Sequence, residues 1–69
     1  MTKTLGDELP RKMKEIREVY IPAYQSIGPS GAFAIHFMNE ALTKAEGALA
    51  TQDIALMIEA LNDLNDFKL

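Results

Sequence analysis

The 69-residue sequence contains no cysteine and only one histidine. Disulfide bonds and thiolate-bound metals are therefore excluded, and a structural zinc site, which needs four Cys or His ligands, is not expected. No apolar run approaches the roughly 20 residues of a membrane-spanning helix. Residues 1–9 also lack the apolar stretch of a signal peptide. These absences predict a cytoplasmic protein with no membrane association, no metal and no cofactor.

A chain of this length forms one domain, close to the lower size limit for folding alone. Its core is expected to supply only roughly 3–5 kcal/mol, so efficient helix packing or oligomerisation must add stability. Ten acidic residues against seven basic ones give a net charge of −3, which disfavours nucleic acid as a partner. We expect a single helical domain over residues 1–69, with residues 1–6 disordered.

Apolar residues at spacings of three and four predict a first helix over about residues 8–26. Asp7 is its expected N-cap. Pro22 removes one backbone hydrogen bond and lies opposite the apolar stripe, which predicts a kink there, with a break after Tyr20 as the alternative. The stripe consists of Leu9, Met13, Ile16, Tyr20, Tyr24 and Ile27.

Glycine and proline in residues 28–31 predict a turn, and Ser30 is the expected cap of a second helix over about residues 30–49. At 100° per residue, its apolar side chains cover one arc of about 160°. The alanines gather on one side of this arc, so one neighbouring helix is expected to come close. The arc holds Phe37, Ala48, Ala41, Ala34, Ala45, Met38, Leu49, Leu42 and Ile35.

A third helix is predicted over about residues 52–66, with Thr51 as its cap and Asp53 favourable in the first turn. Apolar residues cover about half of its circumference. The sequence therefore predicts an all-α fold, a small three-helix bundle.

The second and third helices are apolar over wider arcs than one small core requires. The excess surface predicts self-association, with a dimer favoured, although a higher oligomer and a swap of the first helix at Pro22 stay open. The residues predicted to make the protein contact are Phe33, Phe37, Ala41, Leu56 and Phe67.

Few side chains in this sequence could carry chemistry. His36 and Glu40 could meet as an acid–base pair or half a metal site, but no third ligand lies near, so a solvated pair is predicted. The basic cluster of Arg11, Lys12, Lys14 and Arg17 is interleaved with glutamates. The i,i+4 pairs Glu8–Lys12 and Arg11–Glu15 then predict a solvated face rather than a nucleic-acid site.

Ser30 lies before a helix in a small acidic chain, which resembles the acyl carrier proteins, where a serine at the start of the second helix carries phosphopantetheine. The Asp-Ser-Leu motif of that family is absent, because Pro29 and Gly31 flank Ser30. A carrier modified at Ser30 is the alternative function. A transcriptional regulator comes third, since the second helix offers Glu40, Lys44 and Glu46 where a recognition helix needs basic and amide side chains.

Arg17-Glu18-Val19 and the run from Tyr24 to Phe33 resemble short uncharacterised proteins of tailed phages and prophages. The resemblance covers about residues 9–67 and implies a phage origin without any site residues. The leading hypothesis is a non-enzymatic helical protein-interaction protein that self-associates or acts as a small adaptor or inhibitor of a host protein.

Overall fold

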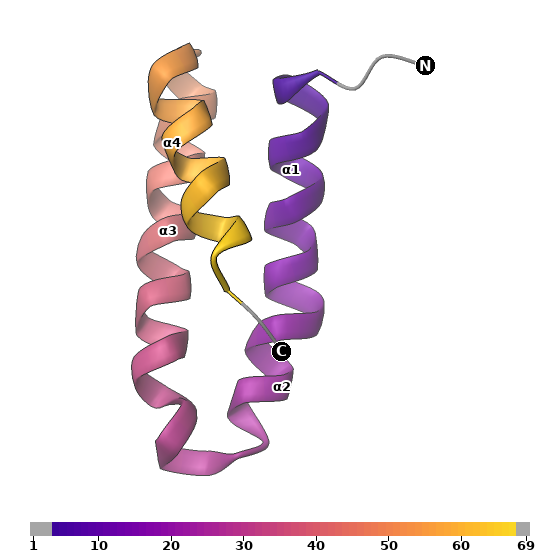
Figure 1. The fold of residues 1–69 in the computed structure, drawn as a ribbon, viewed down its shortest axis with the longest axis vertical. Coiled ribbons are helices and arrows are strands. Elements are labelled where there is room, and N and C mark those ends of the chain that lie inside the picture. Colours follow the sequence, from indigo (N-terminus) through magenta and orange to yellow (C-terminus); the bar gives the residue numbers. More distant parts are fainter. Residues whose placement is uncertain (1–3, 68–69) are drawn as a thin grey trace.

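The computed structural model describes residues 4–67 and confirms an all-α bundle of three helical layers. The first layer is one continuous helical rod of three segments, followed by two further helices (Figure 1). No strand occurs among the described residues. The elements are α1 (Leu5–Glu15), a π-helical turn (Ile16–Tyr20), α2 (Ile21–Gln25), a 3-10 turn (Gly28–Gly31), α3 (Ala32–Thr51) and α4 (Ile54–Asn65).

The cap of α1 is Thr4, and the prediction of Asp7 as N-cap is wrong. The Thr4 hydroxyl oxygen accepts from the Asp7 amide at 3.2 Å, and the hydroxyl donates to the Asp7 carboxylate at 2.9 Å. The helix begins a turn early because Leu5 packs against the core and gains apolar burial. Residues 5 and 6 are therefore helical rather than disordered, and residues 1–3 lie outside the described residues.

The irregularity expected at Pro22 lies in the turn directly before it. The Ile21 amide donates to the carbonyl of Ile16, five residues back, so this turn contains one extra residue. Pro22 follows directly, and because it has no N–H, the backbone hydrogen bond that another residue would donate at this position is missing from the rod. The rod runs without a break from Leu5 to Gln25.

Ser30 does not cap α3, contrary to prediction. It belongs to the 3-10 turn, and Gly31 is the N-cap residue, without a side-chain hydrogen bond. The Ala32 amide donates to the carbonyl of Pro29, so the tight turn itself satisfies a group that a side-chain cap would otherwise serve. A glycine is needed because a Cβ at Gly31 would overlap the carbonyl oxygen of Tyr24.

The cap of α4 is Asp53, whose carboxylate accepts from the Leu56 amide at 3.1 Å. Thr51, the predicted cap, is the last residue of α3 and donates its hydroxyl to the carbonyl of Gly47 at 2.9 Å. Between them Gln52 adopts the left-handed conformation, with φ of 54°, and reverses the chain. Sequence reasoning placed the cap two residues too early because both side chains are good caps.

The core lies between all three layers, and no polar side chain among the described residues is buried. α3 and α4 form the most extensive helix contact, and Ala41, Ala45 and Ala48 of α3 belong to the core. Three of the buried side chains are methionines. The core consists of Leu9, Met13, Ile16, Met38, Ala41, Leu42, Ala45, Ala48, Met57, Ala60 and Leu64.

The two ends of the bundle differ because α4 has 12 residues and α3 has 20. At 1.5 Å per residue, α4 is shorter by roughly 12 Å, and it ends partway along α3 (Figure 1). We call α1, α4 and residues 39–51 of α3 the closed half. The open half consists of α2 and residues 32–38 of α3, and α2 contains no buried residue.

Candidate protein-interaction surface

Several large hydrophobic side chains of this small bundle are exposed to solvent. Their exposed fractions lie between 48% and 78%, far above those of the core. Four of them lie on α3 and α4, and two lie on the first rod and the turn that follows it. Where such residues lie next to one another, they are typical of a contact surface rather than of a free surface. The residues are Val19, Ile27, Phe33, Phe37, Ile54 and Ile58.

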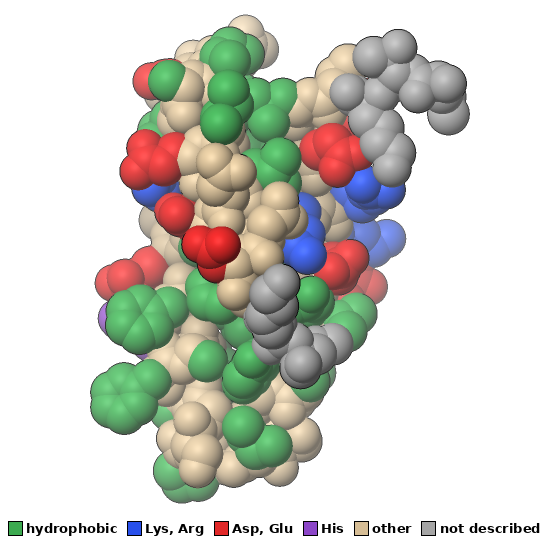
Figure 2. Space-filling view, in the orientation of Figure 1, with side chains coloured by type: hydrophobic (Ala, Val, Ile, Leu, Met, Phe, Trp, Pro, Cys, Tyr) green, Lys and Arg blue, Asp and Glu red, His purple; other side chains and the backbone are tan. Residues whose placement is uncertain are grey.

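The largest exposed apolar feature is a pair of phenylalanines in the open half. Phe33 is 78% exposed and Phe37 is 56% exposed, and they lie one turn apart on α3. Hydrophobic side chains project from the lower part of α3, below the end of α4 (Figure 2). We call this pair the α3 step, because it lies where α3 continues beyond α4. The His36 ring meets the Phe37 ring edge-on, with 5.7 Å between centroids.

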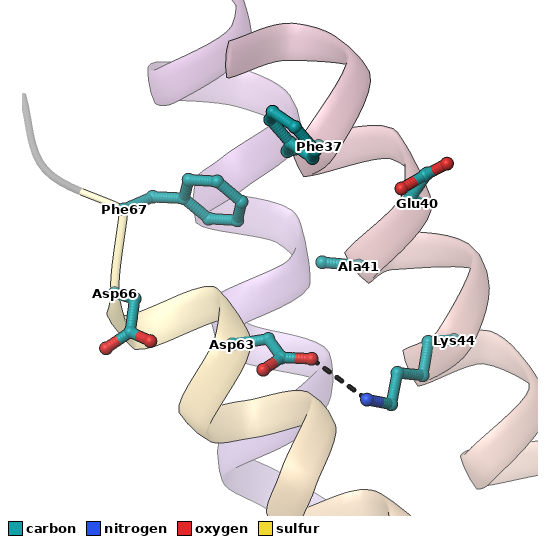
Figure 3. Close-up of a pocket in the computed structure, with 7 residues that line it drawn as sticks. All are labelled: Phe37, Glu40, Ala41, Lys44, Asp63, Asp66 and Phe67. Atoms are coloured by element: carbon teal, nitrogen blue, oxygen red, sulfur yellow. Dashed lines mark hydrogen bonds and ion pairs between the residues drawn. The ribbon is translucent and has the colours of Figure 1, made fainter. Parts of the chain in front are cut away.

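An open depression of about 440 Å³ borders the α3 step where α4 ends (Figure 3). Phe37 forms one side, Ala41 lies at its floor, and Phe67 approaches from beyond the end of α4. The remaining lining is charged and comprises Glu40, Lys44, Asp63 and Asp66. The depression therefore has an apolar end next to the step and a polar rim to which α3 and the end of α4 both contribute.

Lys44 ties the end of α4 to α3 beside this depression. Its ammonium group donates to Glu59 at 2.6 Å and to Asp63 at 3.0 Å. These two hydrogen bonds raise the pKa of Lys44 above its ordinary value, because they favour the charged form. The ion pairs fix where α4 lies on α3 and so set the position of the step.

The structure brings four of the five predicted contact residues near one another and separates Leu56 from them. Phe37, Ala41 and Phe67 line the depression, and Phe33 lies one turn from Phe37. Ala41 is only 7% exposed and faces α4, so its side chain serves contacts inside the chain. Leu56 is partly buried against the core near the other end of α4.

Sequence reasoning missed Ile54 and Ile58, which it assigned to the apolar face of the third helix. They are 60% and 49% exposed. Their helical angles explain this exposure once the buried side of α4 is known. At 100° per residue, both lie well away from the direction shared by Met57, Ala60 and Leu64, which are the buried residues of α4.

The other chemical candidates remain isolated on the surface. His36 lies 3.2 Å from Glu40, and both side chains are well exposed. Within residues 4–67, no three side chains of metal-ligand type form a group that could hold an ion. Ser30 is exposed in the 3-10 turn, and its modification as in a carrier protein stays a prediction.

The basic cluster of the first rod is compensated by carboxylates. Arg11 contacts both carboxylate oxygens of Glu8 at 2.8 Å, and Lys12 contacts Glu15 at 3.0 Å. These are i,i+3 pairs, in place of the predicted i,i+4 pairs. Lys14 lies 3.9 Å from Glu18, and Arg17 pairs with Glu46 of α3. Such pairing reduces the positive potential that phosphate binding needs.

Comparisons with protein-family models, with curated proteins and with solved structures find no match to this chain. None of the helices in residues 4–67 combines the length and the apolar content that crossing a lipid bilayer requires. The surface of the bundle is therefore the feature from which a function can be inferred.

Proposed function

We propose that this chain is a non-enzymatic, cytoplasmic protein-interaction protein that forms a homodimer through the apolar surface of α3 and α4. The observation that carries the proposal is the α3 step, two adjacent phenylalanines that are 78% and 56% exposed. Burying a phenylalanine side chain that is otherwise exposed contributes about 1.5–3 kcal/mol. Association would therefore add to the small stability that a core of this size supplies.

The same surface would serve an adaptor or an inhibitor of a host protein, which fits the resemblance to small phage proteins. Self-association is favoured because exposed apolar residues occur on both α3 and α4, so one chain carries enough surface for both sides of a contact. A catalytic function has no comparable support, because the side chains of the His36–Glu40 pair are 64% and 63% exposed, and His36 is not among the residues that line the depression beside Glu40.

Sedimentation equilibrium over a hundredfold concentration range, combined with thermal melts at both ends, tests this proposal. We expect a reversible dimer whose melting temperature rises with concentration, since dissociation is linked to unfolding by mass action. The variant Phe37→Glu should shift the chain to monomer without loss of helicity. A wild-type chain that stays monomeric at every concentration would reject the homodimer.

Val19→Glu provides the matched control. Val19 is a 48% exposed hydrophobic residue on the first rod, beside Arg11 and Lys14 and away from the α3 step. Its replacement introduces the same charge into a similarly exposed apolar position. Equal weakening by both variants would mean that net charge, rather than the α3 step, controls association.

A further inference from the structure

A second apolar feature lies on α4, at the opposite end of the bundle from the α3 step. Ile54 is 60% exposed and Ile58 is 49% exposed. They lie four residues apart, so their Cβ atoms are about 5–6 Å from one another on one helix face. We call this pair the α4 ridge. Phe33 and Phe37 have the same i,i+4 spacing, so the ridge and the step have equal length.

The ridge and the step lie towards opposite ends of the long axis, which measures 36 Å. The two helices are antiparallel, and the ridge occupies the first turns of α4 while the step occupies the first turns of α3 (Figure 1). On the broad face of the molecule, hydrophobic side chains gather over the upper turns of α4 and again over lower α3 (Figure 2). Hydrophobic side chains therefore lie towards both ends of one broad face of the molecule (Figure 2).

We propose that the α3 step of one chain receives the α4 ridge of a second copy in an antiparallel, two-fold symmetric dimer. This inference rests on the proposed function and specifies its geometry. Because the two features lie at opposite ends of one face, a two-fold axis across the middle of that face brings each ridge onto the partner's step. The contact is then made twice, and the assembly closes as a dimer.

The size of the face fits this arrangement. Its dimensions are 36 and 24 Å, which is enough for the roughly 800 Å² per partner of a standard interface. Between the features, Lys44 bridges Glu59 and Asp63, which offsets part of the acidic charge that the two copies would bring together. Aliphatic isoleucines packed on phenylalanine rings would form the desolvated centres of the two contacts.

Mixing two complementary variants, Phe37→Glu and Ile58→Lys, tests the geometry. Each variant alone places charge in both contacts of its own dimer. In the mixed dimer one contact is unchanged, and the other pairs the new carboxylate with the new ammonium group. We expect the mixture to associate at least about tenfold more tightly than either variant alone, measured by sedimentation equilibrium.

The outcomes separate this inference from the proposed function. A monomeric wild-type chain would overturn both. A dimeric wild-type chain whose mixed variants associate no more tightly than either variant alone would overturn only the pairing of ridge with step. Val19→Glu mixed with Ile58→Lys is the control. Its mixed dimer should bind more weakly than the Val19→Glu homodimer, because the new ammonium group at position 58 has no carboxylate opposite it.

Disulfide trapping provides a second, independent measurement, because the natural sequence has no cysteine. Phe33→Cys retains Phe37 in the step, and Ile58→Cys retains Ile54 in the ridge. Under mild oxidation, a mixture of the two should yield the mixed disulfide, which mass spectrometry distinguishes from either symmetric product. Preferential formation of the symmetric Phe33→Cys disulfide would overturn the antiparallel arrangement, because that product requires the α3 steps of two chains to meet.

Discussion

The closed and open halves of the bundle share α3 but provide it with different neighbours. In the closed half, Ala45 and Ala48 are completely buried beneath α4 and the first rod. In the open half the same helix carries Phe33 and Phe37 at 78% and 56% exposure. Large side chains of α3 are thus exposed at Phe33 and Phe37, whereas Met38 and Leu42 are buried in the core. The two phenylalanines lie where α3 extends beyond the end of α4 (Figure 1).

This contrast separates two uses of apolar residues within one short chain. Alanines on α3 are buried in the core together with Met38 and Leu42. Phe33 and Phe37 lie where α4 has ended, and they remain available for contact with another surface. The contrast can be tested by substitutions that act on one half and spare the other.

Removal of a core side chain from the closed half should have the largest effect. Leu64 is fully buried, so Leu64→Ala should lower the free energy of unfolding by about 2–5 kcal/mol, most of what a core of this size supplies. Phe33→Ala, at protein concentrations where the chain is monomeric, should change it by less than about 0.5 kcal/mol. Urea denaturation measures both, and similar losses would remove the distinction between the halves.

If Leu64→Ala fails to fold, Leu64→Met keeps the comparison measurable. Its volume is nearly unchanged, so its loss should stay below about 1.5 kcal/mol.

Glycine substitutions sharpen the comparison at the connection into α3. Gly31→Ala should destabilise the protein by about 1–3 kcal/mol, because its Cβ would overlap the backbone carbonyl of Tyr24. Gly47→Ala should instead stabilise it by about 0.5–1 kcal/mol, since this position is helical and has open space around it. Chemical denaturation of the two variants gives opposite signs, and a stabilising Gly31→Ala would contradict the tight turn.

The cap of α4 offers a smaller test of the closed half. Asp53→Ala should cost about 1 kcal/mol, because the Leu56 amide loses its acceptor. Thr51→Ala should cost less, since the Thr51 hydroxyl bonds a carbonyl within α3 rather than an amide of α4. Thermal melts distinguish the two, and a larger effect at Thr51 would place the start of α4 where the sequence pattern predicted it.

The smallest effect concerns the pH dependence of the Lys44 bridge. Hydrogen bonds to Glu59 and Asp63 raise the pKa of Lys44 above its ordinary value of 10.5. A raised folded-state pKa contributes stability that is present below the unfolded-state value and is lost as pH rises through the folded-state value. The stability difference between wild type and Lys44→Met should therefore hold at neutral pH and decrease above pH 10.5.

Lys14→Met is the matched control for this titration, because Lys14 is 75% exposed and its carboxylate partner lies 3.9 Å away. Its removal should leave the alkaline part of the stability curve almost unchanged. An equal response in both variants would show that the alkaline loss comes from net charge rather than from the bridge.

Helical periodicity predicted the three-layer fold and most of the core. The positions of Leu9, Met13 and Ile16, and the alanines of α3, are determined locally by the 3.6-residue repeat, so they were recognisable. The positions of the helix ends were not recognisable from the sequence. Thr51 and Asp53 are both residue types that cap helices well. Which of them caps α4 depends on the left-handed conformation of Gln52, and glutamine is not a residue type that indicates this conformation.

The surface was predicted only in part, for a tertiary reason. The excess apolar area of the predicted helices indicated a contact with another protein chain. Phe33 and Phe37 were predicted to belong to that contact surface. Ala41 could not be excluded from the surface without knowing how close α4 lies, and Ile58 could not be assigned to it without knowing which side of α4 faces the first rod. These questions depend on packing between helices, which no local pattern encodes.

The methionines of the core give the molecule built-in reporters of its own opening. Met13 and Met57 are 4% and 5% exposed, and Met38 is fully buried. A thioether reacts with peroxide only when it meets solvent, and the sulfoxide that forms is polar enough to disrupt a core. Oxidation of Met38 would therefore record fluctuations at the border of the open half, and oxidation of Met13 and Met57 would record those of the closed half.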